Sequence, residues 1–117
     1  MNSEAYIKRI CEVASEKKAM DICVYELKVP VLSDTVIVLS VKNHIHAKAT
    51  AVELVKEVRK NSDVYSDLSK PTLTGDAASG WVILDMGNMI VHIMDSTMRQ
   101  MYEIDLLLES QAVVYHI

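Results

Sequence analysis

Imidazole and thiol groups, the usual ligands of transition metals, are few in this chain, since its 117 residues include four histidines and two cysteines. His44 and His46 stand two positions apart in a segment predicted to be helical, where side chains at i and i+2 point in different directions and cannot easily share an ion. No cysteine or cluster of acids completes a ligand set beside them. We therefore predict no metal site and no cofactor, and we expect His46 to serve the structure or the edge of a site.

General acid–base catalysis has little support in the sequence. His92 alternates with Ile90 and Met94 along a predicted strand, which is the usual pattern of a half-buried, hydrogen-bonded histidine. A catalytic role would need an acid or a nucleophile positioned beside it, so we assign His92 to the structure or the edge of a site. Cys11 and Cys23 lie in apolar patterns, and we expect reduced thiols in the core rather than a disulfide.

Phosphate chemistry is also poorly supported. The three glycines are isolated, so they form no phosphate-binding loop. The order of helices and strands is similar to that of nucleotidyltransferase-like folds, whose enzymes use a Gly-Ser turn followed by paired carboxylates that hold magnesium. Here Ser79-Gly80 has the reverse order, and Asp85 lacks a second acid two residues away. We predict that the protein is not an enzyme, and a nucleotide-binding or nucleotidyltransferase-like enzyme is the alternative.

The chain has one tryptophan, Trp81, and a methionine, Met86, at a predicted hairpin tip. A large apolar residue at a turn has little core to enter, so we expect Met86 to be exposed. Trp81 fits a core position at the start of a strand as well as it fits an interface. Exposed tryptophan and methionine beside acids make a protein-docking patch. The residues alone thus indicate a small α/β binding module.

Hydrophobic periodicity predicts the elements that position these residues. Apolar residues at helical spacing indicate a helix over 3–18 and a second one that begins after the cap Asn43 and runs to about 58, and a third helix is predicted to begin near Asp95 or Ser96. Runs of β-branched residues predict strands over 22–27, 35–41, 81–85 and 89–94. Residues 61–80 are predicted to be a loop with a short strand near 72–74, and residues 111–117 to be a strand or a frayed tail.

The connections between these elements predict the fold class. Residues 29–34 and the turn 86–88 are short and imply antiparallel neighbours, whereas a helical crossover implies a parallel pair. We predict one domain over 1–117 of the α/β class: a small mixed β-sheet with helices packed on it, in a nucleotidyltransferase-like topology that lacks the catalytic motif.

Composition limits the partners. The formal charge is −4, whereas a nucleic-acid binder normally carries a basic face, so we expect no direct sequence-specific contact with nucleic acid. The acid excess suits a basic protein partner. No signal-peptide pattern opens the chain, and its longest apolar run is far below the roughly 20 residues that span a bilayer. We expect no membrane contact and a cytoplasmic location.

The segment 75–94, GDAASGWVILDMGNMIVHIM, resembles the signature of the Iojap family of ribosomal silencing factors. That signature has a glycine followed after five residues by tryptophan, an apolar strand, a turn of the form Asp-hydrophobic-Gly-Asp and a strand with Val-His. Arg99, Tyr102 and residues 104–107 look like the family's ending, Arg-x-x-Tyr-x-Leu-Glu-x-Leu-Trp. Weaker matches lie upstream, at 19–22, 33–34, Ser40 and His46, so the resemblance covers about 5–108.

The sequence departs from the family pattern in its polar detail. The family's Ser-Gly-Thr-Ser-x-Arg-His run loses its glycine and arginine over 40–46, Thr74 replaces a glutamate, Asn88 replaces an aspartate and Leu108 replaces the terminal tryptophan. The apolar pattern is intact, so these changes bear on surface contacts more than on the fold.

The resemblance implies a function. Such factors bind large-subunit ribosomal protein fourteen at the face that meets the small subunit, and thereby block subunit joining and repress translation when nutrients are short. The residues that match the family's contact motif are Trp81, Asp85, Met86, Gly87 and Asn88. Arg99 and Tyr102, like His46 and His92, are assigned to the structure or the edge of the site. A homodimeric scaffold that uses the same patch is a further alternative.

Overall fold

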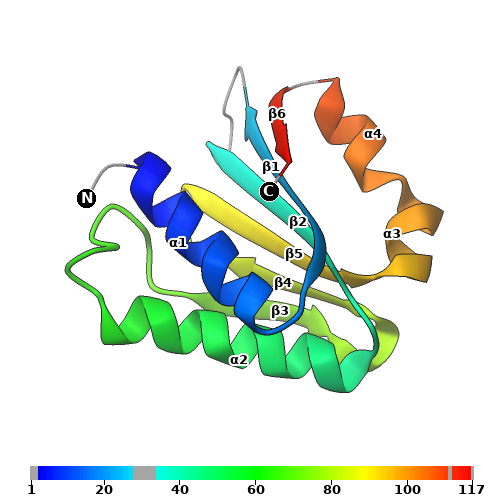
Figure 1. Cartoon of the computed structure of the whole chain (residues 1–117), viewed down its shortest axis with the longest axis horizontal. Coiled ribbons are helices and arrows are strands. Elements are labelled where there is room, and N and C mark those ends of the chain that lie inside the picture. The colour runs from blue at the N-terminus through cyan, green and yellow to red at the C-terminus, as the bar shows by residue number, and fades with distance from the viewer. Residues whose placement is uncertain (1–2, 28–33, 111, 117) are drawn as a thin grey trace.

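The computed structural model describes residues 3–27, 34–110 and 112–116. Within these residues the strands form one mixed sheet of six, in the order β3-β4-β5-β2-β1-β6, with helices on both faces (Figure 1). The elements in chain order are α1 (Ser3–Glu16), β1 (Met20–Leu27), β2 (Thr35–Val41), α2 (His44–Lys60), β3 (Thr72–Asp76), the short helix η1 (Ala77–Ser79), β4 (Trp81–Asp85), β5 (Met89–Asp95), α3 (Ser96–Tyr102), α4 (Ile104–Glu109) and β6 (Ala112–His116).

The pairing of the strands confirms the predicted mixed sheet. β1 and β2 are antiparallel, as are β4 and β5, whereas β2 and β5 are parallel. The parallel pair lies at the centre of the sheet, where the fully buried pattern of β2 reflects its almost entirely apolar sequence. Residues 28–33, where the sequence places a proline break, lie outside the described residues.

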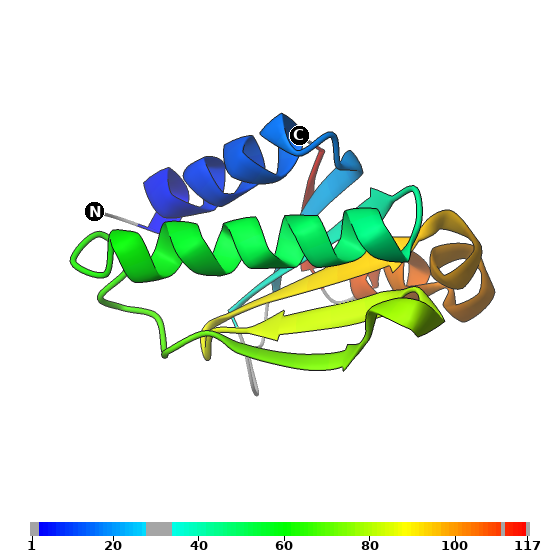
Figure 2. The ribbon, with the colours of Figure 1, turned by 90° about the horizontal axis from the view of Figure 1, so that it is seen from below.

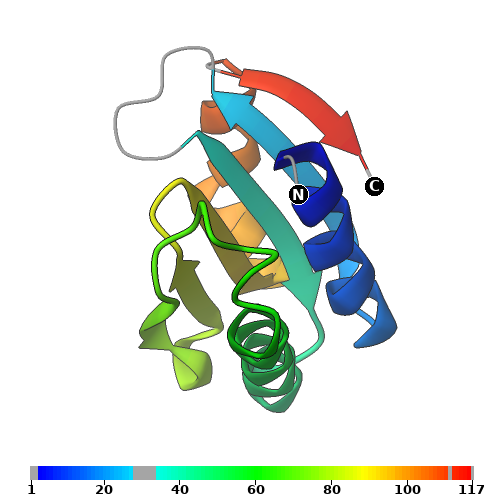
Figure 3. The ribbon, with the colours of Figure 1, turned by 90° about the vertical axis from the view of Figure 1, so that its left-hand side faces the viewer.

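The helices divide between the two faces of the sheet. α1 and α2 form one layer, seen above the sheet in Figure 2 and in front of it in Figure 3, while α3 and α4 lie behind it. The main core lies under α1 and α2 and includes Ile10, Ile37, Leu54 and Ile93. A smaller core lies under α3 and α4, around Tyr25, Val38 and Met94. Successive side chains of a strand point to opposite faces, so alternate residues of each strand pack against the two helical layers.

Two helices begin where the sequence predicts, each after a capping side chain. The Asn43 side chain accepts a hydrogen bond from the His46 N–H at 2.9 Å and begins α2. Asp95 accepts from the Met98 N–H at 2.8 Å and begins α3. The last helix is not continuous, however, because Glu103 adopts φ 47° and separates α3 from α4. The terminal segment, predicted as a strand or a tail, pairs with β1 as the edge strand β6.

Candidate functional site

Trp81 stands at the start of β4, on the sheet face that carries α3 and α4. Its indole N–H donates to Nδ1 of His92 at 3.0 Å, and the two ring centroids lie 5.8 Å apart. The indole also contacts Tyr102 of α3, with the two ring centroids 5.1 Å apart and the ring planes tilted by 53°. Trp81 is half-buried and Tyr102 is 56 % exposed. Three residues from three elements thus build an aromatic cluster that reaches the surface.

His92 is neutral in this arrangement. Its Nδ1 accepts the indole hydrogen and so carries no proton. Burial lowers the pKa of His92 from 6.5 to about 4, which keeps the ring in the accepting form at neutral pH. The expected half-buried, hydrogen-bonded histidine is what the structure contains, and its partner is the tryptophan.

The sheet face beside Trp81 is only partly covered. α3 and α4 pack on β5, β2, β1 and β6, so the end of the sheet that holds β3 and β4 projects beyond them. Ile83 and Asp85 follow Trp81 on this face of β4, because alternate residues share a face. The residues paired with β4 on the edge strand, such as Thr74 and Asp76, are exposed. The result is an aromatic and aliphatic strip bordered by acids.

The apolar surface continues onto the two short helices. Met101, Tyr102, Leu106 and Leu107 are each more than half exposed. Among the described residues, these four make up half of the large hydrophobic side chains that are exposed. Such a concentration on two adjacent helices is typical of an interaction surface.

The expected exposure of Met86 is wrong. Its side chain is 0 % exposed and belongs to the main core under α1 and α2. The segment that follows α2 folds over the hairpin tip, where Ser69 N–H donates to the Met86 carbonyl at 2.8 Å and Tyr65 and Leu68 join the same core. The polar composition of that segment gave no sign that it covers the turn.

The structure also separates Trp81 from Met86. The two residues stand at opposite ends of β4 and pack into different cores, on opposite faces of the sheet. They therefore do not form one hydrophobic corner. Tyr102, which sequence reasoning placed at the site edge, is the side chain that the structure brings to Trp81.

The remaining residues of the hairpin shape its turn. Asp85 is exposed, and its Oδ1 accepts from the Gly87 N–H at 2.9 Å. Gly87 has φ 78°, a conformation that favours glycine. The Asn88 carbonyl accepts from the N–H groups of Asp34 and Thr35, each at 3.0 Å, and fixes the turn to the start of β2.

His46 lies in a separate hydrogen-bond network. Its Nδ1 accepts from the Lys42 N–H at 3.0 Å, so Nε2 carries the hydrogen and donates to the Lys17 carbonyl at 2.6 Å. This ring joins the start of α2 to the end of α1. Both ring nitrogens are thus used by backbone groups of the protein itself.

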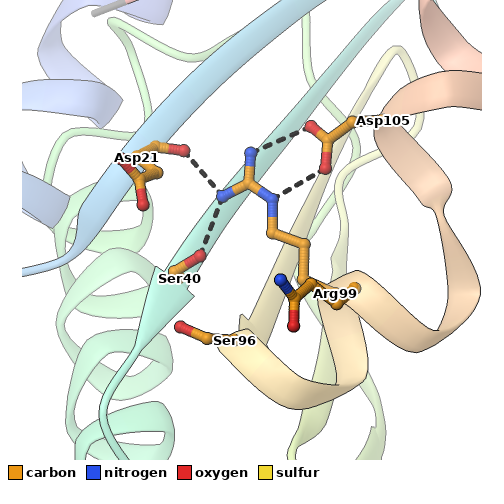
Figure 4. Close-up of a pocket in the computed structure, with 6 residues that line it drawn as sticks. Asp21, Ser40, Ser96, Arg99 and Asp105 are labelled. Carbon is orange, nitrogen blue, oxygen red and sulfur yellow. Dashed lines mark hydrogen bonds and ion pairs between the residues drawn. The ribbon is translucent and has the colours of Figure 1, made fainter.

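Arg99 occupies the inner side of α3, beside a cavity of about 310 Å³. Its guanidinium forms a two-pronged ion pair with Asp105 and also reaches the Asp21 carbonyl and Ser40 Oγ (Figure 4). The sequence identified Arg99 but not these partners, which lie up to 78 positions away. A cation on the inner face of a short helix requires such partners, because burying a charge without them is costly.

Fold and site together define a small α/β domain with an aromatic surface cluster, in which the indole N–H of Trp81 bonds to His92 and the Tyr102 ring contacts the indole. None of the described helices has both the length and the apolar character needed to cross a membrane. The family model for the ribosomal silencing factor during starvation matches residues 1–116. The chain belongs to this family, whose members are non-catalytic regulators that bind the ribosome and repress translation.

Two solved structures share the fold. A protein from Chromobacterium violaceum is 24 % identical, with a TM-score of 0.80 over 97 % of this chain and 91 % of that one. A protein from Bacillus halodurans is 20 % identical, with a TM-score of 0.74 over 90 % of this chain and 94 % of that one. The likeness supports the α/β architecture with a mixed sheet and packed helices.

Proposed function

We propose that Trp81 and Tyr102 form the centre of the surface by which this silencing factor docks on the large ribosomal subunit, at large-subunit ribosomal protein fourteen. Occupying that protein sterically prevents the small subunit from joining. The location of this activity is the cytoplasm. The observation that carries the proposal is the ring contact of 5.1 Å between a half-buried tryptophan and an exposed tyrosine.

The chemistry of the cluster suits a protein partner. The indole N–H already has an acceptor in His92, so covering the ring removes apolar surface from water without leaving a donor unsatisfied. Large aromatic anchors of this kind dominate the binding energy of many interfaces. Asp76 and Asp85 lie on the same face and supply negative charge for a basic partner.

The other residues assigned from the sequence keep supporting roles in this proposal. Asp85, Gly87 and Asn88 form the far end of the same hairpin and extend the contact surface. Met86 contributes from within, because its side chain anchors the turn to the core. A contact between Met86 and the partner is not part of the proposal.

Co-sedimentation with purified large subunits tests the docking surface. Trp81→Ala and Tyr102→Ala are each expected to weaken binding by about 2 kcal/mol or more, close to a 30-fold loss of affinity. Ile45→Ala is the control, since Ile45 is 70 % exposed at the start of α2, in the helical layer on the other face of the sheet (Figure 2). Circular dichroism establishes that each variant is folded. Wild-type binding by folded Trp81→Ala and Tyr102→Ala would exclude this surface.

Self-association through the same patch is the alternative, because the exposed leucines of α4 adjoin it in sequence. Light scattering of the wild type and of Trp81→Ala separates the two functions. A wild-type dimer that becomes monomeric in the variant while large-subunit binding is unchanged would favour the scaffold.

A further inference from the structure

We infer that Arg99 is a positioning residue: its guanidinium clamps α3 and α4 to the sheet and thereby holds Tyr102 against Trp81. The inference rests on the proposed docking role of these two aromatic residues. The inference explains why Tyr102 lies against Trp81. The residues responsible, those of the Arg99 clamp, touch neither the partner nor the indole.

Every N–H of the Arg99 guanidinium has an acceptor. Nε and one N–H of Nη2 bond to the two oxygens of Asp105 at 2.8 and 2.9 Å. The two N–H groups of Nη1 bond to the Asp21 carbonyl at 2.7 Å and to Ser40 Oγ at 2.9 Å, and the second N–H of Nη2 lies 3.4 Å from Cys23 Sγ. Figure 4 shows the fork reaching across from α3 to β1, β2 and α4. A side chain that is 12 % exposed and fully bonded has one orientation.

Asp105 is itself held by a second donor. The Tyr25 hydroxyl of β1 donates to Asp105 Oδ1. The hydrogen bonds from Arg99 lower the pKa of Asp105, so its carboxylate is ionised at neutral pH, and burial raises the pKa of Tyr25, so its hydroxyl keeps the donated proton. The clamp thus joins α3, α4 and two strands through one carboxylate and one guanidinium.

The two helices depend on such a clamp. α3 has seven residues and α4 has six, lengths at which a helix is not stable by itself. The N-terminus of α3 continues directly from β5 and is capped by Asp95, but its other end leads into Glu103, where the chain turns at φ 47°. Met98, Ile104 and Leu108 are only partly buried against the smaller core. The clamp therefore fixes the end of α3 that the strand does not.

Tyr102 lies at that end. It is three positions after Arg99, so the two side chains leave the helix on neighbouring faces. Arg99 reaches toward β2 and β1, while Tyr102 reaches toward Trp81 on β4. The contacts of Arg99 with β1 and β2 and of Tyr102 with β4 together fix the rotation of α3 about its own axis. Without the clamp, the tyrosine ring must be ordered at the moment of binding, at a cost to affinity.

The chain contains a matched control on the opposite face of the sheet. Tyr65 is 2 % exposed, and its hydroxyl donates to Glu57 Oε2 at 2.8 Å, much as the fully buried Tyr25 donates to Asp105. Tyr25→Phe and Tyr65→Phe each remove one buried hydroxyl from a carboxylate, and only the first touches the clamp. Arg99→Lys is the companion variant, because it keeps the charge, loses the fork and has the adjoining cavity to accommodate its ammonium group.

Three measurements on the full chain decide the inference. Tyr25→Phe and Arg99→Lys are expected to weaken large-subunit binding by about threefold to tenfold, the effect of ordering one side chain on binding, whereas Tyr65→Phe binds as the wild type does. Amide hydrogens of 96–109 exchange faster in the two clamp variants than in Tyr65→Phe. Emission from Trp81, the only tryptophan, shifts to longer wavelength in the clamp variants as its ring loses Tyr102.

The outcomes separate this inference from the docking proposal. If Trp81→Ala loses binding while folded Tyr25→Phe and Arg99→Lys bind normally, the positioning role is wrong and the docking surface stands. If Trp81→Ala also binds normally, the docking proposal fails, and hydrogen exchange and emission still decide whether the clamp holds Tyr102. Unchanged exchange and emission in both clamp variants would overturn the inference whatever the binding result.

Discussion

Trp81 and His92 illustrate how one hydrogen bond limits the conditions under which the aromatic cluster is intact. The indole can only donate, so the imidazole nitrogen opposite it must be unprotonated. Protonation of His92 would place a donor against a donor and a charge in a site that is largely shielded from water.

The free energy of unfolding is therefore expected to decrease as the solution is acidified from pH 6.5 toward pH 4. The pKa of His92 is about 4 in the folded chain and 6.5 in its ordinary state, so the unfolded chain binds the proton more readily. The neutral His92 ring therefore contributes up to about 3 kcal/mol to the free energy of unfolding. This contribution is fully present above pH 6.5 and is lost as the pH falls toward 4. Urea denaturation of the wild type and of His92→Gln at several pH values measures it. A difference between the two that does not vary over this window would contradict the assignment.

Met86 leads to a different expectation, because its side chain contributes to the fold and not to the surface. Met86→Ala removes a fully buried side chain from the main core and is expected to lower the free energy of unfolding by about 2–5 kcal/mol. Binding to large subunits should be unchanged for the folded fraction. Thermal unfolding gives the first quantity and co-sedimentation below the transition gives the second. A stable variant with weak binding would restore Met86 to the contact surface.

The elements show where local sequence is sufficient and where it is not. The strand over 35–41 and the cap at Asn43 were predictable, because β-branched runs and capping side chains act within a few residues. The break at Glu103 was not, since no glycine or proline marks it. The clamp that accompanies this break joins Arg99 to residues as distant as Asp21. The segment after α2 covers Met86 through contacts that are likewise distant in sequence, so the local pattern did not predict them.

A substitution at Gly80 tests how the β3–β4 hairpin packs against the start of α3. It has φ 86°, and an added Cβ would lie 2.1 Å from Oδ2 of Asp95, the residue that caps α3. Gly80→Ala is therefore expected to displace the cap and destabilise the protein by about 1–2 kcal/mol. Urea denaturation measures the loss, and faster exchange of the Met98 amide locates it. Ser79→Ala, at the exposed neighbouring position, is the reference variant, and it loses only the hydrogen bond from its hydroxyl to the Asp76 carbonyl. Equal stability of Gly80→Ala and the wild type would show that Asp95 moves without cost.

At the level of the whole molecule, the question is how an acidic protein binds a particle rich in RNA. The net charge of −4 disfavours contact with phosphates, and the candidate surface offers aromatic rings bordered by Asp76 and Asp85. An acidic domain of this kind is suited to a protein on the ribosome surface, where rings can be buried and acids can meet basic side chains.

The salt dependence of binding distinguishes these modes. A protein that neutralises about six phosphates loses affinity with a slope near −5 in a plot of log K against log salt. Docking through Trp81 and Tyr102 instead predicts a slope between 0 and about −1, because aromatic burial is insensitive to salt and exposed ion pairs contribute little. Titration of labelled protein with large subunits from 50 to 300 mM potassium chloride at constant magnesium gives the slope. Asp85→Asn should flatten any residual dependence, since it removes an acid without touching the rings. A steep slope that Trp81→Ala leaves intact would mean that ribosomal RNA, rather than a protein, receives this factor.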